Sequence, residues 1–399
     1  MIDTAVALSS RPVGVPAGSA AEALLATDLG ALRLIADRAG PDEVAAVLAR
    51  PRRSLADLAV LLSPAATSRL DDLAAAAHAA SLRRFGRVVK LYAPLYLSSE
   101  CVSTCTYCGF SAANEIARRT LSVDEVRAEA EVLLAAGFRH LLLVAGEHAR
   151  LVSHAYVTDC LRALAPVVPS LSVETQVWDV DAYERMVAAG CEGLAVYQET
   201  YDRDLYAQVH LKGKKRNYDW RLAALDRGAQ AGMRSLAVGA LLGLHGDWRR
   251  EVLAVAAHAQ ALTIRWWRCE VSVSLPRLRP AAGHGTGNPP PPTSVDDASF
   301  VQVVCALRLA LPDVGIAVST RESPTMRDGL VRLGVTAMSA GSRTEPGGYL
   351  DPAGAEPQFE VSDERSPAQI AEMLRFAGYE TVWRDTIGAR RQHEARAQP

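Results

Sequence analysis

Eight short apolar segments recur between residues 88 and 340 of this 399-residue chain, and an amphipathic stretch separates most of them. The segments are Val88–Leu97, Leu141–Ala145, Leu171–Thr175, Gly193–Tyr197, Leu236–Leu242, Cys269–Leu275, Val314–Ser319 and Val335–Ser339. Strands that alternate with helices predict a parallel sheet, because each helix returns the chain to the start of the next strand. Eight such units match the roughly 250 residues of a (β/α)8 TIM-type barrel. A doubly wound open sheet is the structural alternative.

The barrel is expected over residues 88–340, with an N-terminal helical extension over 1–87 and a C-terminal extension over 341–399. Amphipathic Ala/Leu-rich patterns predict helices in both extensions and at one well-marked place in the barrel. These are Ala20–Ala26, Leu32–Arg38, Asp42–Arg50, one helix from Ser63-Pro64 to about Phe85, a helix capped by Ser122 and Glu125 and ended by Gly137, and Ser366–Phe376. The Gly/Pro-rich stretch Ala281–Thr293 is expected to be a surface loop, and the tail from Ala389 to be frayed.

Charge balance and hydropathy limit the classes of partner. The chain has 43 Lys and Arg against 45 Asp and Glu, so bulk electrostatics favour neither nucleic acid nor an anionic membrane. No stretch reaches the roughly 20 apolar residues of a membrane span. Met1–Gly14 lacks the basic and apolar regions of a secretory signal. We therefore expect a cytoplasmic, reducing setting.

Three cysteines fall within eight residues, in the sequence Cys101-Val-Ser-Thr-Cys105-Thr-Tyr-Cys108. This C-x3-C-x2-C loop directly follows the first predicted strand, which places it at the barrel end where active sites form. Three thiolates on one tight loop can hold three irons of a 4Fe–4S cluster and leave the fourth iron without a protein ligand. Such an open iron could coordinate a substrate.

A structural zinc site is the plainer alternative for this loop. Zinc needs a fourth ligand in good geometry, and the nearest histidines, His140 and His148, belong to the next β-α unit. The remaining cysteines are scattered singly at positions 160, 191, 269 and 305. Three unrelated buried thiols are a second alternative, which the Ser and Thr neighbours of a polar loop disfavour.

The spacing of the cysteines and their position after the first strand resemble the radical S-adenosylmethionine superfamily. Further motifs, from about Leu61 to about Asp385, are similar to the 2-iminoacetate synthase family, the tyrosine lyases of thiamine biosynthesis. They are residues 61–66 (LLSPAA), 94–98 (PLYLS), 105–111 (CTYCGFS), 144–148 (VAGEH), 196–201 (VYQETY), 210–215 (HLKGKK), 274–280 (SLPRLRP), 319–324 (STRESP) and 346–349 (PGGY).

The resemblance implies a reaction and its cofactors. A 4Fe–4S cluster and S-adenosyl-L-methionine would generate a 5′-deoxyadenosyl radical that takes a hydrogen from the amino group of L-tyrosine. Cleavage of the Cα–Cβ bond would then give p-cresol and 2-iminoacetate (dehydroglycine) for thiazole synthesis. Thiazole synthase is the expected partner, with a flavodoxin or ferredoxin type electron donor.

The resemblance also assigns site residues. The cluster ligands would be Cys101, Cys105 and Cys108. Residues expected near S-adenosyl-L-methionine are Tyr107, Gly146, Glu147, Gln198, Glu199 and Arg279, the last preferred over Arg277. Residues expected at the substrate are Arg321, for its carboxylate, and Tyr96 and Ser339, near its amino group. Structural alternatives are a helix-cap neighbour for Glu147, a core aromatic for Tyr96 and a loop residue for Ser339.

Other features leave alternatives open. The Lys212–Lys215 run could cradle a phosphate or form a solvated turn, and His210 and Tyr206 could belong to a lid. The 174–178 segment departs from the pattern expected of the family, which leaves the aromatic substrate open. A related tryptophan-cleaving lyase and a non-catalytic Fe–S or zinc scaffold are the alternative functions. The last cysteine is Cys305, so the second cysteine trio of the lyase that matures the [FeFe]-hydrogenase cofactor is not expected.

Overall fold

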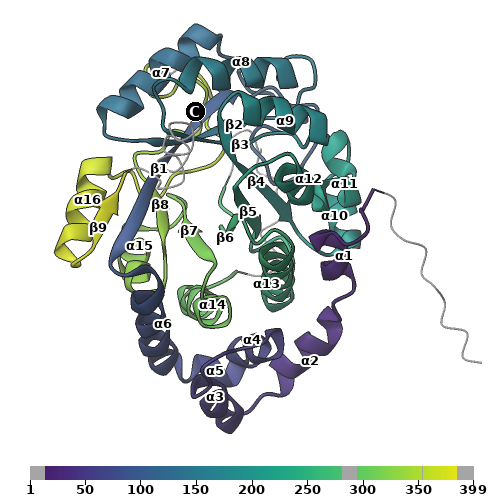
Figure 1. The fold of residues 1–399 in the computed structure, drawn as a ribbon, viewed down its shortest axis with the longest axis vertical. Coiled ribbons are helices and arrows are strands. Elements are labelled where there is room, and N and C mark those ends of the chain that lie inside the picture. The colour runs from purple at the N-terminus through teal and green to yellow at the C-terminus, as the bar shows by residue number, and fades with distance from the viewer. Residues whose placement is uncertain (1–13, 281–293, 353, 384–399) are drawn as a thin grey trace, which may run out of the picture.

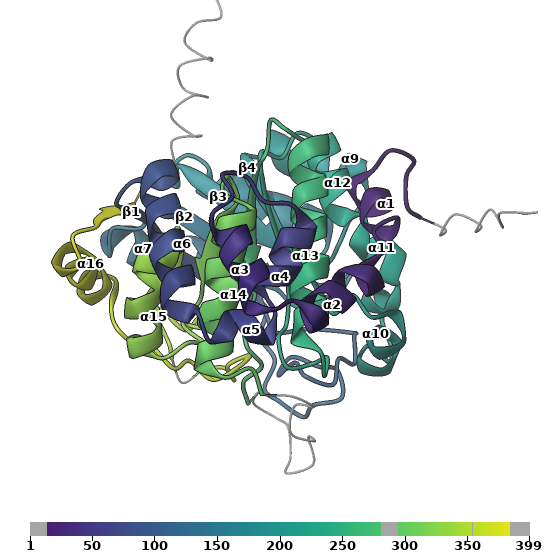
Figure 2. The same ribbon diagram turned by 90° about the horizontal axis from the view of Figure 1, so that it is seen from below.

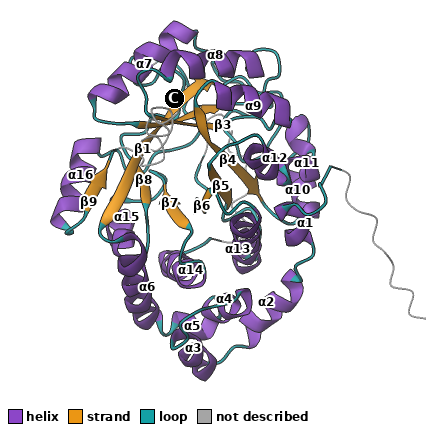
Figure 3. Ribbon diagram, in the orientation of Figure 1, coloured by secondary structure: helices purple, strands orange, loops and turns teal. Residues whose placement is uncertain are grey.

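The computed structural model describes residues 14–280, 294–352 and 354–383. Eight parallel strands form a closed barrel, with order β2 to β8 followed by β1, which pairs again with β2 (Figure 3). They are β1 (Val88–Ser98), β2 (His140–Ala145), β3 (Ser170–Glu174), β4 (Cys191–Glu199), β5 (Ser235–Ala240), β6 (Glu270–Ser274), β7 (Gly315–Val318) and β8 (Ala337–Ser339). The predicted TIM-type barrel is confirmed, and the open-sheet alternative is wrong.

A ring of helices surrounds the strands (Figure 1). Its members are α7 (Val123–Ala135), α8 (His154–Leu164), α9 (Val180–Ala188), α10 (Arg203–Val209), α11 (Tyr218–Leu222), α12 (Ala224–Gln230), α13 (Trp248–Arg265), α14 (Asp297–Ala310) and α15 (Pro324–Leu330), with 3-10 turns η1 (Lys214–Arg216) and η2 (Val331–Leu333). The predicted capping box is present at α7, where the Glu125 carboxylate accepts from the Ser122 N–H at 2.7 Å.

The N-terminal extension covers one side of the barrel, outside α13 and α14 (Figure 2). Its helices are α1 (Ala20–Leu25), α2 (Leu29–Arg38), α3 (Pro41–Leu48), α4 (Leu55–Leu61), α5 (Pro64–Thr67) and α6 (Leu70–Phe85). The buried Gln302 of α14 donates to the carbonyls of Leu61 and Ser63 at 3.0 and 2.9 Å. These bonds satisfy the end of α4 and fix the extension to the barrel wall.

The single helix predicted from Ser63-Pro64 to Phe85 is wrong, because the chain breaks it between Thr67 and Leu70. The Ser68 hydroxyl donates to the Ala65 carbonyl at 2.7 Å, a local bond that competes with the helical pattern. Arg69 then leaves the helical conformation, with ψ at 29°. The predicted stop at Gly86 is confirmed by its positive φ of 66°.

The C-terminal segment adds an element that the sequence did not predict. Strand β9 (Glu380–Val382) pairs in parallel with the first residues of β1, Val88–Lys90, outside the closed barrel. It follows helix α16 (Pro367–Phe376), a predicted helix whose N-terminus is capped by Ser366. The predicted loop Ala281–Thr293 and the tail from Ala389 lie outside the described residues.

A buried ion pair fastens this segment to the barrel. Arg327 of α15 donates to the Asp363 carboxylate and to the Ser339 carbonyl, and both charged side chains have no exposed surface. Arg365 also donates to Asp363, at 2.7 and 2.9 Å. The described part of the chain contains no helix long and apolar enough to cross a membrane.

Substitution of Asp363 by Ala should therefore be strongly destabilising, because it leaves the buried Arg327 charge uncompensated. We expect the free energy of unfolding, measured by urea denaturation, to fall by about 3–5 kcal/mol. Glu372→Ala, which removes an exposed 3.8 Å pair with Arg375 on α16, should change it by less than about 0.5 kcal/mol. Equal effects of the two substitutions would contradict this role of Asp363.

Candidate active site

The carboxyl ends of the strands surround one cavity, which is lined by residues from six strands and by residues that directly follow β5 and β7. In a barrel of parallel strands the segments after each strand meet at the same end, so residues far apart in sequence converge there. The cavity is lined by the three cysteines, by polar strand-end side chains and by residues 358 and 359 of the C-terminal segment. This cavity is the candidate active site.

The cysteine loop forms one wall. Cys101, Cys105 and Cys108 all line the cavity, and all three are free thiols. The Cys101 sulfur accepts from the Ser103 backbone N–H at 3.4 Å, and the Cys108 sulfur from the Gln358 side-chain amide at 3.5 Å. Such donors stabilise the thiolate form, which is the form that binds metal.

Glycines let the loop approach its neighbours. A Cβ on Gly146, after β2, would lie 2.4 Å from the Glu100 carbonyl oxygen and 3.2 Å from the Cys101 Cβ. A Cβ on Gly109 would lie 2.3 Å from the Gln358 carbonyl oxygen. The predicted Gly146 thus lines the cavity and also permits close packing of the loop that precedes Cys101.

The segment from Val209 to Lys215, here called the strap, lies across the cysteine loop. Cys105 forms an antiparallel bridge with His210, and the N–H groups of Thr104 and Thr106 donate to strap carbonyls at 3.3 and 3.0 Å. A Cβ on Gly213, whose φ is 90°, would lie 2.6 Å from the Ser103 Cα. Lys212, Gly213 and Lys214 are exposed, as the solvated-turn alternative expects, whereas Lys215 turns inward and lines the cavity.

His210 and Tyr107 connect the strap to the loop. The His210 Nδ1 lies 2.9 Å from the Tyr206 carbonyl, which can only accept, so Nδ1 carries the proton. Nε2 therefore accepts from the Tyr107 hydroxyl at 2.8 Å. Burial, with the Lys215 charge, lowers the pKa of His210 to about 3, so the ring stays neutral. Tyr107 lines the cavity, as predicted, and its orientation is fixed by this bond.

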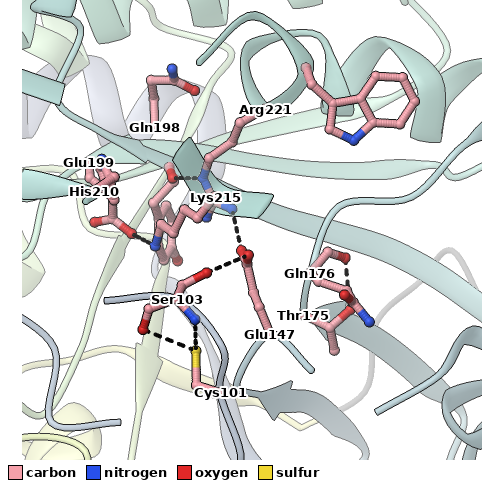
Figure 4. Close-up of polar contacts among 12 residues, drawn as sticks. Cys101, Ser103, Glu147, Thr175, Gln176, Gln198, Glu199, His210, Lys215 and Arg221 are labelled. Carbon is pink, nitrogen blue, oxygen red and sulfur yellow. Dashed lines mark hydrogen bonds and ion pairs between the residues drawn. The ribbon is translucent and has the colours of Figure 1, made fainter. Parts of the chain in front are cut away.

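Lys215 and Glu199 form a largely buried ion pair in the wall of the cavity, with Nζ 2.7 Å from the carboxylate (Figure 4). Burial would raise the pKa of Glu199, but the charges of Lys215 and Arg221 outweigh it and lower that pKa. Glu199 also has a positive φ of 70°, which is uncommon outside glycine and marks the irregular end of β4. This conformation turns the Glu199 carboxylate into the cavity.

The Glu147 carboxylate accepts hydrogen bonds from two different segments of the chain (Figure 4). One oxygen lies 3.1 Å from Arg221 of α11, and the other accepts from the Ser103 hydroxyl at 3.3 Å. Its side chain lines the cavity and is buried. A carboxylate with two fixed donors and a free edge toward the cavity can also accept from an ammonium group.

Arg321, after β7, supplies a guanidinium that no acidic group of the described residues pairs with. Its charged end stacks on the Phe359 ring, 3.4 Å from the ring centroid. Burial lowers its pKa, although the charges of Tyr96, Glu199 and Glu174 act the other way. Such a group can bind a carboxylate through two parallel hydrogen bonds.

Tyr96 and Ser339 line the same cavity, where the sequence placed them. The Tyr96 hydroxyl donates to the Gln358 side-chain oxygen at 2.8 Å, and its ring lies edge-on to Phe110. The Ser339 hydroxyl accepts from the Thr320 N–H at 3.1 Å. The strand ends thus bring Arg321, Tyr96 and Ser339 into one cavity with the cysteine loop, and Tyr96 packs in one cluster with Cys101 and Cys108.

Gln198 and Arg279 lie outside the cavity. Successive side chains of a strand point to opposite faces, so Tyr197 and Glu199 point inward and Gln198 points toward α11, where it donates to the Tyr218 carbonyl at 3.4 Å. The prediction that Gln198 shares the pocket with Glu199 is wrong. Arg279 and its neighbour Arg277 both turn to the buried Glu322 carboxylate instead of the cavity. The prediction that Arg279 faces the ligand is therefore not supported by its position.

Sequence reasoning missed several lining residues. These are Ser103, Glu174, Lys215, Arg221, Gln358 and Phe359. Glu174 stood in a segment that we interpreted only as a departure from the family pattern, although its place at the end of a predicted strand was a signal. The lysine run that contains Lys215 stood out in the sequence, but the sequence did not predict that Lys215 lines the cavity. Arg221, Gln358 and Phe359 had no local signal, because a helix or a long-range connection brings them to the cavity.

The residues fit an iron–sulfur cluster better than a single ion. No three His, Cys, Asp or Glu side chains among the described residues could hold one metal ion together. A cuboidal cluster instead separates its ligands over different irons, as three cysteines around one cavity require. Cys160, Cys191, Cys269 and Cys305 do not line the cavity, so none supplies a fourth thiolate there. The zinc alternative is not favoured.

Comparison with known families agrees with this chemistry. Residues 95–259 match the radical SAM superfamily, and residues 274–380 match the Biotin and Thiamin Synthesis associated domain. The first match includes the cysteine loop and Glu147, and the second includes Arg321 and the segment that carries Gln358. Because the second match crosses residue 340, the boundary at that residue stays a prediction.

Curated relatives and a solved structure extend the similarity over most of the chain. The 2-iminoacetate synthase of Salmonella typhimurium is 41% identical over 329 residues, 82% of this chain and 86% of that protein. That of Escherichia coli is 42% identical over the same shares. The crystal structure of HydG, a maturase of the [FeFe]-hydrogenase, has a TM-score of 0.86 at 30% identity, over 92% of this chain and 82% of HydG. The chain belongs to the 2-iminoacetate synthase family of radical S-adenosylmethionine enzymes.

Proposed function

We propose that this enzyme cleaves the Cα–Cβ bond of L-tyrosine to give 2-iminoacetate and p-cresol. The observation that carries the proposal is one cavity that is lined both by three cysteines and by the guanidinium of Arg321, which pairs with no acidic group of the described residues. The first is suited to an iron–sulfur cluster, and the second to the carboxylate of an amino acid. The 2-iminoacetate synthase relatives supply the reaction.

Cys101, Cys105 and Cys108 would hold the cluster, and Glu147 would accept from the amino group of S-adenosyl-L-methionine. When bound, the cluster and S-adenosyl-L-methionine would supply the radical chemistry that starts the reaction on the substrate. The chain itself contributes orientation and the exclusion of water. Glu147 is already fixed by Arg221 and Ser103, so its carboxylate needs little further ordering.

Arg321 would bind the tyrosine carboxylate, and Tyr96 and Ser339 would lie near its amino group. This arrangement presents the amino group to the radical and leaves the side chain to occupy the rest of the cavity. Gln358 and Phe359 line the cavity from the C-terminal segment, with contacts to Tyr96 and Arg321 respectively. Side chains that cover a bound radical protect it from side reactions.

We further propose thiazole synthase as the partner that takes up the unstable 2-iminoacetate, and a flavodoxin or ferredoxin as the electron donor. A cytoplasmic setting is proposed because the thiolates must stay reduced to bind iron. A tryptophan lyase and a non-catalytic scaffold are not favoured, because the curated relatives that cover most of the chain are 2-iminoacetate synthases.

Anaerobically reconstituted enzyme that is reduced and given S-adenosyl-L-methionine and tyrosine should release p-cresol and 5′-deoxyadenosine. Tryptophan under the same conditions should give no 3-methylindole. Chromatography with mass detection measures all three products. Deoxyadenosine without p-cresol would contradict tyrosine cleavage and leave the radical chemistry intact.

Substitution of Cys105 by Ser should prevent assembly of the cluster, because two thiolates hold it poorly. The wild-type protein should contain about four irons and four sulfides per chain, and the variant less than about one of each. Cys305→Ser, at a buried cysteine outside the cavity, is the control and should keep the full content. Full iron and sulfide in Cys105→Ser would exclude Cys105 as a ligand.

Substitution of Arg321 by Ala should raise the KM for tyrosine by about 30- to 150-fold, because it removes charge-assisted hydrogen bonds worth about 2–3 kcal/mol. The KM of Arg321→Lys should lie between those of wild-type enzyme and Arg321→Ala, because lysine keeps the charge but cannot form two parallel hydrogen bonds to a carboxylate. Binding of S-adenosyl-L-methionine, measured by calorimetry, should stay unchanged. Equal losses for both ligands would contradict a role specific to the substrate.

A further inference from the structure

Three carboxylates line the cavity, and one of them has no partner. Glu147 is paired with Arg221 and Glu199 with Lys215. The Glu174 carboxylate forms no hydrogen bond or ion pair with any other described residue. Glu174 is partly buried, and a carboxylate that is largely removed from solvent without a partner is costly, so native proteins keep such groups at functional positions. Nothing in the mechanism above uses Glu174.

Glu174 is the last residue of β3 and faces the inside of the barrel. It is in register with Val144 of β2, which in turn is in register with Tyr96, and all three line the cavity. Burial, together with the charge of Glu199, raises the pKa of Glu174 to about 7, although Lys215, Arg221 and Arg321 act against this. A ligand that donates a hydrogen bond would therefore stabilise its charged form.

Tyr92, Tyr197 and Ser274 form a polar floor near this carboxylate, whose charge acts on both tyrosines. Tyr92 lies four residues before Tyr96, about 13 Å back along β1, and it is in register with Ser339. The Tyr92 side chain interacts with the Ser339 hydroxyl, and that of Tyr197 with Ser274. The floor residues Tyr92, Tyr197 and Ser274 line the cavity, and both tyrosines already have a serine partner.

The floor is packed closely enough to be a fixed surface. Gly239 lies between Tyr197 and Ser274 in the sheet register. A Cβ there would lie 2.0 Å from the Ser274 carbonyl oxygen and 2.8 Å from the Tyr197 ring, so only glycine admits this arrangement. Burial and the Glu174 charge raise the pKa of both floor tyrosines, that of Tyr92 to about 12, so their hydroxyls stay protonated.

We propose that Glu174 accepts a hydrogen bond from the phenol hydroxyl of the substrate and so selects tyrosine over phenylalanine. The inference rests on the proposed tyrosine cleavage. With the substrate carboxylate on Arg321 near the mouth, the aromatic side chain extends toward the floor and brings its hydroxyl to the one carboxylate without a partner. Hydrophobic contacts alone separate phenylalanine from tyrosine poorly, whereas a buried polar group left unpaired penalises phenylalanine.

The competing role for Glu174 is an ion pair with the substrate amino group. That group is one bond from the Cα that carries the carboxylate, so Arg321 holds it near the mouth beside Tyr96. The two roles differ in one measurable respect. A residue that binds the amino group affects tyrosine and phenylalanine equally, whereas a residue that binds the phenol affects tyrosine alone.

The test compares binding of L-tyrosine and L-phenylalanine to reconstituted enzyme with S-adenosyl-L-methionine present and no reductant, so that turnover cannot start. Calorimetry should show wild-type enzyme binding tyrosine about 100-fold more tightly than phenylalanine. Glu174→Leu should reduce this ratio to about threefold or less, mainly by weakening tyrosine. Glu174→Gln keeps the shape of the side chain and one acceptor oxygen, so its affinity ratio should lie between those of wild-type enzyme and Glu174→Leu. This variant replaces the leucine variant in the test if the latter does not fold.

Arg321→Lys is the matched control within the site: both affinities should fall, and the tyrosine to phenylalanine ratio should stay near the wild-type value. An unchanged ratio in both Glu174 variants, or equal losses for the two amino acids, would overturn the inference. The release of p-cresol by wild-type enzyme is measured separately. Its absence would reject the proposed cleavage, while a Glu174-dependent preference for tyrosine would still support the phenol contact.

Discussion

The closure of eight parallel strands is the constraint on which the site depends. Because each strand ends at the same mouth, residues separated by more than two hundred positions, such as Tyr96 and Arg321, line one cavity. The barrel interior must also accommodate several charges. Two carboxylates are neutralised by Arg221 and Lys215, which come from segments after β4. The polar character of the site therefore depends both on the closed barrel, which gathers these side chains, and on the ion pairs, which neutralise two of its carboxylates.

The cysteine loop owes its position to contacts from three distant segments. His210 of the strap forms a β-bridge with Cys105. Gly146 lacks the side chain that would clash with the backbone before Cys101. The Gln358 side chain donates a hydrogen bond to Cys108. Each contact comes from a different strand connection or from the C-terminal extension. A loop of three cysteines alone would be flexible, and these contacts order it before any metal binds. They also shield it from solvent on the side of the strap.

The sequence predicted the barrel well because its strands are apolar runs bounded by glycines and helix caps, which are local signals. The two errors within the site also have physical causes. Gln198 was placed in the pocket without regard to the alternation of side chains along β4, and Arg279 without knowledge of the buried Glu322 that attracts it. Strand β9, of three residues, pairs with a partner nearly three hundred positions away, and no local pattern marks it. Arg221 and Phe359 reach the cavity for similar long-range reasons.

The central claim is that three thiolates hold a cluster with one iron open to S-adenosyl-L-methionine. Electron paramagnetic resonance of the reduced protein, recorded before and after addition of S-adenosyl-L-methionine, tests it most directly. Coordination of the open iron should change the g values of the cluster signal, and methionine alone should not reproduce the change. A reduced cluster whose spectrum is identical with and without S-adenosyl-L-methionine would contradict the account.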